Sequence, residues 1–300
     1  MDIEVYNHIR SGGAGFHEQK RGLIAVWGKE AVQFLDGMIT NDIKTLEDGQ
    51  QMLAAFPNAQ GRLLAVVRVL RQGDRFLFET EEATREKLFQ NLFRFTFAGD
   101  FFVEDISDSF HFFELFGLRP GPPTAFGYSK GTAPPVSHAG YRFYGPANVE
   151  LVALKKEAGD IRPDIARISN DLYEVLRIEA GIPKFGIDMD ETTIVPELGF
   201  PEMISYTKGC YVGQEIIARI HFRGHVAKQL SGVTIDGEAN PGDELTIDGK
   251  NAGTVKSVTY SPKLEKHVAL AFVRYDHLAD GTELSVNGHS ARVTELPFIK

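Results

Sequence analysis

The sequence predicts an α+β protein with a larger N-terminal body and a small antiparallel β-barrel at its C-terminal end. Two observations carry this prediction. Before Gly224, short apolar runs of strand length alternate with stretches whose apolar residues recur at helical spacing. After Gly224, six strand-length segments follow one another with glycine-rich turns between them, which is typical of a small barrel. We therefore expect two domains, residues 1–224 and 225–300.

The first part of the body is expected to mix strands and helices. Residues 22–28 are an apolar run closed by glycines, and residues 29–38 place their apolar side chains on one helical face. The turn Gln72-Gly73-Asp74 lies between two strand-like runs and predicts a β-hairpin. The expected elements are strands at 22–28, 63–70, 75–80, 101–104 and 110–116 and helices at 29–38 and 81–97.

The second part of the body contains an irregular stretch. Residues 117–140 hold five prolines, which predicts a connector and allows the body to consist of two subdomains. Residues 171–180 have the apolar spacing of a helix, and an acidic, proline-containing extended stretch follows up to residue 200. The remaining strands are expected at 141–144 and 149–154 and, in the barrel, at 229–235, 244–247, 253–260, 268–273, 283–286 and 291–296.

Composition excludes several classes of protein. The chain has 300 residues, of which 43% are hydrophobic and 24% charged, as in ordinary globular proteins. A net charge of −9 argues against sequence-independent binding to nucleic acid phosphates. No apolar run approaches the ~20 residues of a membrane span, so no membrane association is expected. The N-terminus resembles neither a secretory signal nor a transit peptide, which predicts a cytoplasmic protein.

Cys210 is the single cysteine of the chain. A single cysteine excludes an intrachain disulfide and fits a reducing compartment. It also excludes a stable iron–sulfur cluster held by this chain alone, because such clusters usually take four thiolates. His221 and His225 are four residues apart, but Arg223-Gly224 between them predicts a loop or strand, so no metal site is expected.

The cysteine lies in the run Lys208-Gly209-Cys210-Tyr211-Val212-Gly213-Gln214-Glu215, which is followed by Ile-Ile-Ala-Arg. Flanking glycines leave a thiol accessible. The neighbouring cation Lys208 and a short helix predicted from Gln214 onward would both favour the reactive thiolate. The alternative is an inert cysteine that serves as a small hydrophobic residue.

The pattern Lys-Gly-Cys-Tyr-x-Gly-Gln-Glu-x-x-x-Arg resembles the signature of the YgfZ family. Members of this family are folate-binding relatives of the glycine-cleavage T protein and are implicated in assembly or repair of iron–sulfur proteins. Four further segments, at 28–43, 176–183, 186–188 and 196–197, are similar to the T-protein superfamily, so that the resemblance covers nearly the whole chain.

The resemblance implies a T-protein-like folate-binding body that uses tetrahydrofolate or a derivative. In that fold the helix bearing Arg-x-Glu-x-Gly supplies an arginine to folate, which here is Arg177, and a guanidinium can pair with the pterin or with the glutamate carboxylates. The alternative is that Arg177 and Glu179 form surface ion pairs on their own helix. The residues implied are Cys210 and Lys208 for chemistry, and Arg177, Glu179, Asn41, Tyr211, Gln214, Glu215 and Arg219 for the cofactor.

Two departures from the T-protein pattern concern catalysis. T proteins carry an acidic residue in the strand after the glycine-rich turn that precedes the first hairpin, where it interacts with folate at the reacting nitrogen. Leu64 and Ala65 occupy the corresponding positions here. The T-protein pattern Gly-Tyr-Thr-Gly-Glu is replaced by Gly140-Tyr-Arg-Phe-Tyr-Gly-Pro146, without the glutamate.

The function expected from the resemblance is that of an accessory protein for iron–sulfur enzymes. Its partners would be folate and, transiently, client iron–sulfur proteins or the cluster-assembly machinery. One alternative is a folate-dependent aminomethyl or one-carbon transferase, against which the missing carboxylate argues. Another is a purely structural adaptor with a vestigial pocket, which would not bind folate.

Overall fold

The computed structural model describes residues 1–117, 140–145, 149–158 and 165–299. These residues form two compact units. The sheet unit comprises residues 2–168 and 200–216, and the barrel unit comprises Met1 and residues 169–199 and 217–300. Within the described ranges, no helix combines the length and the apolar character needed to cross a membrane.

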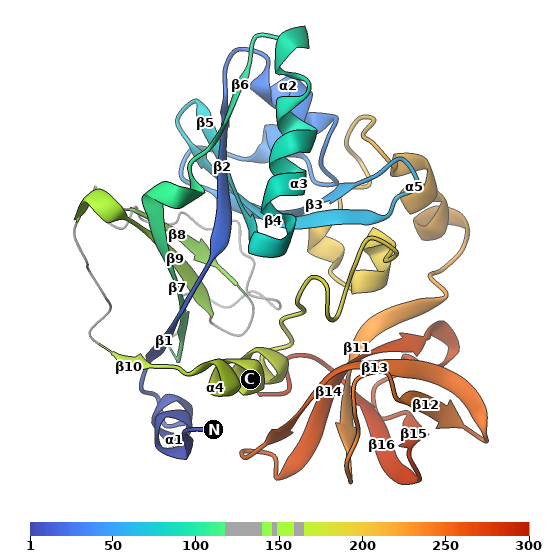
Figure 1. The fold of residues 1–300 in the computed structure, drawn as a ribbon. Helices are drawn as coiled ribbons and strands as arrows, with labels where there is room; N and C mark the ends of the chain where they lie inside the picture. Colours follow the sequence, from blue (N-terminus) through green and yellow to red (C-terminus); the bar gives the residue numbers. More distant parts are fainter. Residues whose placement is uncertain (118–139, 146–148, 159–164, 300) are drawn as a thin grey trace. The chain divides into compact units, whose positions relative to one another are not determined.

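The sheet unit contains two five-stranded sheets (Figure 1). The first has the strand order β3-β4-β5-β2-β6 and is antiparallel throughout. The second has the order β10-β1-β7-β9-β8, in which only β1 and β10 run parallel. The strands are β1 (Gly15–Gln19), β2 (Arg21–Trp27), β3 (Gln51–Pro57), β4 (Leu63–Gln72), β5 (Arg75–Glu81), β6 (Phe102–Asp105), β7 (Phe110–Phe116), β8 (Gly140–Tyr144), β9 (Glu150–Lys155) and β10 (Ala166–Arg167). The helices are α1 (Ile3–Arg10), α2 (Ala31–Asp36) and α3 (Glu82–Phe93), with short 3-10 turns η1 (Ile43–Thr45), η2 (Thr96–Ala98), η3 (Ser107–Ser109), η6 (Lys156–Ala158) and η8 (Pro201–Met203).

Strand β2 explains how this unit is held together, because both of its faces are buried. Ile24 and Val26 join the core that also contains Leu35 of α2 and Leu88 of α3. Leu23 and the other alternate residues of β2 join a second core, with aromatic and aliphatic side chains of β7, β8 and β9. A strand buried on both faces reads as a continuous apolar run, which is what residues 22–27 show.

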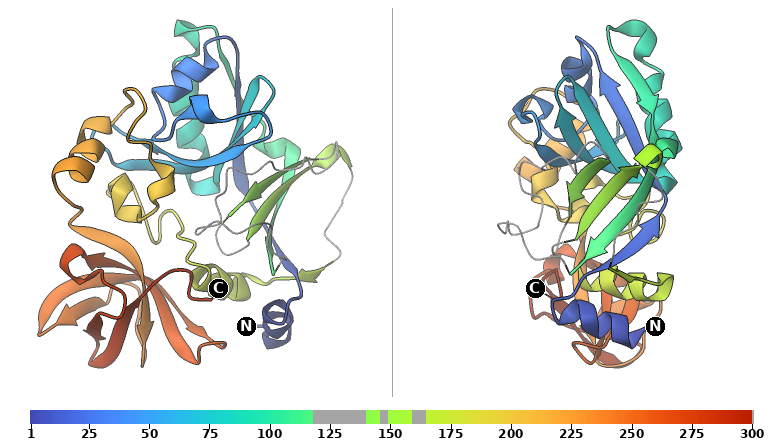
Figure 2. Two further views of the ribbon diagram at one scale, coloured as in Figure 1. Left: turned by 180° about the vertical axis from the view of Figure 1, so that it is seen from behind. Right: turned by 90° about the vertical axis from the view of Figure 1, so that its left-hand side faces the viewer.

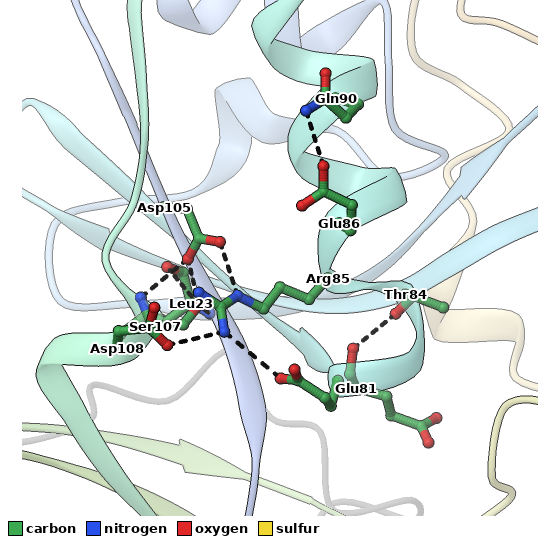
Figure 3. Close-up of polar contacts among 10 residues, drawn as sticks. Leu23, Glu81, Thr84, Arg85, Glu86, Gln90, Asp105, Ser107 and Asp108 are labelled. Atoms are coloured by element: carbon green, nitrogen blue, oxygen red, sulfur yellow. Dashed lines mark hydrogen bonds and ion pairs between the residues drawn. The ribbon is translucent and has the colours of Figure 1, made fainter.

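A polar network anchors the start of α3 to the chain after β6 (Figure 3). Arg85 Nε donates to Asp105 Oδ2 at 2.7 Å, and Arg85 Nη1 donates to Asp108 at 3.0 Å. Ser107 Oγ in turn accepts the Leu23 amide at 2.7 Å, so the network reaches β2. These side chains thereby fix the turn that leads from the first sheet to the second.

The barrel unit is built around a closed six-stranded barrel with the order β11-β14-β13-β12-β15-β16, orange to red in Figures 1 and 2. Helix α4 (Asn170–Glu179) begins at Ser169, whose side chain accepts the Leu172 amide. Ile178 of α4 contacts apolar side chains of β11 and β14. The strands are β11 (Lys228–Ile235), β12 (Glu244–Ile247), β13 (Lys250–Ser261), β14 (Lys266–Arg274), β15 (Glu283–Val286) and β16 (His289–Thr294), and the remaining turns are η7 (Val195–Leu198) and η9 (Tyr275–His277).

The predicted fold class is confirmed, and all six predicted barrel strands are present. The expected helix at 29–38 is shorter, at 31–36, and the one at 81–97 ends at Phe93 before a 3-10 turn. Helix α1 and strands β1, β3 and β10 were not expected from the sequence. For β3 the reason is that Met-Leu-Ala-Ala-Phe is too short an apolar run to distinguish strand from helix.

The expected domain boundary near residue 224 remains a prediction. Contacts group residues 169–199 with the barrel, because α4 packs on it, and helix α5 (Gln214–Arg223) begins in the sheet unit and ends in the barrel unit. The expected connector at 117–140 lies almost entirely outside the described residues.

Candidate functional site

The segment that carries the cysteine motif is held along the chain that follows α2. The Ser205 amide donates to Thr40 O at 2.9 Å, and the Val212 amide donates to Gly37 O at 3.0 Å. Thr40 Oγ1 donates to Met203 O at 2.7 Å and accepts the Ala55 amide at 2.9 Å. Residues 203–212 are therefore fixed by backbone hydrogen bonds on both sides of Cys210.

Lys208 belongs to this segment, and its side chain is buried, with only 1% of it exposed. Its ammonium donates to three backbone carbonyls, Asp36 O at 2.6 Å, Ile39 O at 3.0 Å and Asn41 O at 2.8 Å. Its Nζ also lies 3.2 Å from Asp36 Oδ1. Burial lowers the pKa of Lys208 below its ordinary value, and the carboxylate of Asp36 opposes that effect.

Asp36 is a charged residue that the sequence analysis did not assign to the site. It is the last residue of α2 and is 6% exposed, with Lys44 Nζ at 2.5 Å from Oδ2. A carboxylate at a helix C-terminus opposes the helix dipole, so a buried one there needs cations. An acidic residue at the C-terminal end of an expected helix is therefore the sequence signal that could have pointed to Asp36. Burial by itself would raise the pKa of Asp36, but Lys44 and Lys208 together hold it below its ordinary value.

Acid pH is expected to remove the contribution of Asp36 to stability. A carboxylate whose pKa is lowered by folding stabilises the folded protein above its unfolded-state pKa of about 3.9, and that contribution is lost as the pH falls through the folded value. The free energies of unfolding of the wild type and of Asp36→Asn, measured with urea, should therefore differ near neutral pH and draw together as the pH falls below about 3.9. A difference that does not change with pH would contradict this role.

The motif itself presents Cys210 to solvent. Tyr211 points the other way and is buried, with Lys208 Nζ 5.1 Å from the centre of its ring, and burial raises the pKa of its phenol. Gln214 Nε2 donates to Gly209 O at 3.4 Å, across the cysteine, and Glu215 is exposed in the first turn of α5. In this motif Cys210 is thus exposed, while the side chains of Lys208 and Tyr211 are buried.

Gly213 shows why this motif needs glycine. Its φ is +79°, and a Cβ there would lie 2.4 Å from Asn58 O and 3.0 Å from Gly61 Cα. The motif therefore rests on the turn between β3 and β4. The next strand, β4, carries Leu64, partly buried in the first core, and Ala65, fully buried. These are the two positions where the resemblance to T proteins implies an acid.

Asn41 is also engaged within the sheet unit. Its Nδ2 donates to Leu53 O at 2.7 Å and to Glu202 O at 2.8 Å, and its Oδ1 accepts the Asp42 amide at 2.9 Å. Its amide thus ties η8 to β3, and its predicted cofactor contact stays a prediction.

Arg177 lies in the barrel unit and is 1% exposed. Its Nε donates to Glu174 at 2.8 Å, and Nη1 donates to Ile182 O at 3.1 Å and to Asp188 Oδ2 at 2.9 Å. Nη2 donates to Ser257 Oγ at 2.9 Å and lies 2.7 Å from Glu174 Oε2. Four hydrogen bonds and the further ion-pair contact with Glu174 engage all three guanidinium nitrogens, so folate would have to compete with these partners for the side chain. The predicted folate contact stays a prediction.

The remaining predicted residues also belong to the barrel unit. Glu179 is fully buried and accepts the hydroxyl of Ser261, at the end of β13, at 2.5 Å. Arg219 is exposed on α5, and burial of Ile217 places the opposite face of the helix against the protein. The structure thus gathers Lys208, Asn41 and the cysteine motif in the sheet unit, and Arg177 with Glu179 beside the barrel strand β13.

Comparisons with known families agree with this fold. Residues 3–121 match the model of the GCVT N-terminal domain, and residues 228–300 match that of the glycine cleavage T-protein C-terminal barrel domain. The crystal structure of aminomethyltransferase T of the glycine cleavage system from Bartonella henselae has a TM-score of 0.80 to this chain. The two share 20% sequence identity, over 98% of this chain and 89% of that one.

Two curated relatives represent the two functions that the sequence left open. A mitochondrial iron–sulfur cluster assembly factor IBA57 homolog from Mycosarcoma maydis is 26% identical over 226 residues, 70% of this chain. The match spans 54% of that relative, so about half of its length is covered. An aminomethyltransferase from Rubrobacter xylanophilus is 27% identical over 97% of this chain and 84% of its own. With its N-terminal and barrel domains both matched, the chain belongs to the glycine-cleavage T-protein family.

Proposed function

We propose that this protein is a folate-binding accessory factor for the assembly or repair of iron–sulfur enzymes, in the YgfZ branch of the family. It would act with tetrahydrofolate or a derivative, in the cytoplasm, and would meet its client proteins transiently. The observation that carries the proposal is the exposed Cys210 on a segment bonded on both sides to residues 37–40. The similarity to the IBA57 homolog, an iron–sulfur cluster assembly factor, supports it.

The competing function is aminomethyl transfer, which the relative from Rubrobacter and the structure from Bartonella favour. That reaction needs a group to interact with the reacting nitrogen of folate. Leu64 and Ala65 provide no carboxylate at the family position. A protein that keeps the T-protein fold but lacks this acidic side chain is better suited to binding folate than to catalysing aminomethyl transfer.

The cofactor is the first part of the proposal to test. Calorimetric titration with tetrahydrofolate should detect binding to the wild type and weaker binding to Arg219→Ala, an exposed motif residue whose loss should not disturb folding. One charge-assisted hydrogen bond is worth about 1.5–3 kcal/mol, so affinity should fall roughly ten- to a hundredfold. Arg292→Ala is the matched control, because Arg292 is an exposed arginine of the barrel unit outside the predicted site. Absence of binding to the wild type would favour the adaptor function.

The second part of the proposal to test is that the protein has no aminomethyltransferase activity. Formation of methylene-tetrahydrofolate from an aminomethylated carrier protein should stay at the background level. Turnover of ordinary enzymes, about 1–1000 per second, would instead favour an aminomethyltransferase.

A further inference from the structure

The ammonium of Lys208 is enclosed by oxygen atoms from a single stretch of chain. Three carbonyls of residues 36–41 accept its hydrogen bonds, which is as many as an ammonium can donate, and Asp36 Oδ1 lies 3.2 Å away. One of these carbonyls, Asp36 O, is the last of α2, where a helix leaves its final carbonyls without partners. Lys208 therefore satisfies backbone groups that would otherwise be buried unpaired.

This geometry does not fit a lysine that activates a neighbouring thiol by its charge. The side chain is buried, and the carboxylate of Asp36 lies close to its ammonium, 3.2 Å from Nζ. The exposed cation of the cluster is Lys44, whose side chain is 58% exposed and which binds the other oxygen of Asp36. Within the cysteine segment, the Lys208 ammonium lies 5.1 Å from the centre of the Tyr211 ring, and the thiol follows two residues after Lys208 along the chain.

The bonds of Lys208 also belong to a set that brackets Cys210. The Ser205 amide bonds to Thr40 O, the Lys208 ammonium to the carbonyls of residues 36, 39 and 41, and the Val212 amide to Gly37 O. Two of these anchors precede Cys210 and one follows it. This approach does not depend on glycine at position 209, because a Cβ there would meet only Asp36 Oδ2, at an ordinary contact distance of 3.9 Å.

We propose that Lys208 is a positioning residue for Cys210: its buried ammonium binds the chain after α2 and so holds residues 205–212 in place. Its effect on the thiol is one of geometry and not of charge. This deepens the proposed function, on which the role of Cys210 rests. The hold of Lys208 on residues 205–212 can be measured without any folate or iron–sulfur assay. A failure of the proposed function would therefore not change the result of that measurement.

The experiment compares Lys208→Met, Lys208→Arg and the control Lys44→Met with the wild type. Methionine keeps the length of the stem and removes the charge. Arginine keeps the charge, but its planar fork cannot direct three donors at carbonyls that converge on one point. Lys44→Met removes a charge from the same carboxylate without touching residues 205–212. The readouts are amide hydrogen exchange at Ser205 and Val212 and the rate of iodoacetamide labelling of Cys210 against pH.

In the wild type the Val212 amide should be protected although the residue is 38% exposed, because it bonds to Gly37 O. Both Lys208 variants should raise exchange at Ser205 and Val212 by about tenfold or more, which corresponds to loss of one charge-assisted bond. The limiting labelling rate should change while its pH midpoint stays in place. Lys44→Met should resemble the wild type in exchange.

Three results would overturn the proposal. One is rapid exchange of the Val212 amide in the wild type, which needs no variant. Another is wild-type exchange in Lys208→Arg, which also decides the matter if Lys208→Met does not fold. The third is a labelling midpoint that rises in Lys208→Met and returns in Lys208→Arg, since that pattern would assign the effect to charge.

Discussion

Replacing Arg177 by alanine is expected to lower the free energy of unfolding by about 3–5 kcal/mol, because it leaves a buried carboxylate without its partner. That carboxylate is Asp188, which is 0% exposed and has Arg177 Nη1 at 2.9 Å. The hydroxyl of Ser257 and the backbone amide of Lys184 remain bonded to Asp188, but neither carries a charge. Such a loss is a large part of the roughly 5–15 kcal/mol that stabilises a typical domain.

Urea denaturation of the variants measures this loss. Arg292→Ala is the control in the same unit, because Arg292 is 60% exposed and its pair with Glu283 should contribute less than about 1 kcal/mol. Arg177→Lys should recover little, since one ammonium cannot replace donors that reach Glu174, Asp188 and Ser257 together. If Arg177→Ala is as stable as Arg292→Ala and binds folate more weakly, Arg177 serves the ligand and not the fold.

Replacing Cys210 by serine is expected to abolish function while leaving the fold intact. Cys210 is exposed, so serine changes little in packing. A thiol forms an appreciable amount of thiolate near neutral pH, whereas a hydroxyl without a general base is a weak nucleophile. In cells that lack the protein, the wild type should restore iron–sulfur enzyme activity and Cys210→Ser should not. Thermal unfolding and tetrahydrofolate affinity should be nearly those of the wild type.

Cys210→Ala is the second variant, and it should fail in the same way, since both lack the thiol. Full rescue by Cys210→Ser would show that the motif acts through its backbone and its glycines. Loss of folate affinity in Cys210→Ser would instead place the thiol in contact with the cofactor. Loss of rescue in a variant that is folded and still binds folate is the result that supports a chemical role.

Local pattern was sufficient for most of the elements. The barrel strands, the first hairpin, α4 and the helix after the cysteine motif each follow from residue spacing and turn residues within one stretch of chain. Strand β3 could not be recognised in this way, because its burial depends on its pairing with β4 and on the helices above it. The same limit applies to α1 and β1, whose short apolar patterns carry little local signal.

The candidate site likewise has features that the sequence predicts and features that only the tertiary structure shows. The sequence by itself determined that Cys210 stands in a glycine-flanked motif, that a helix follows it, and that Leu64 and Ala65 carry no carboxylate. Only the tertiary structure decided what the charged residues bind. The partners of Lys208 lie 167 to 172 positions away, and Ser257 lies 80 positions from Arg177. A charge in a sequence predicts only that some partner is needed, because its choice of carbonyl or carboxylate depends on which distant segments folding brings within hydrogen-bonding distance.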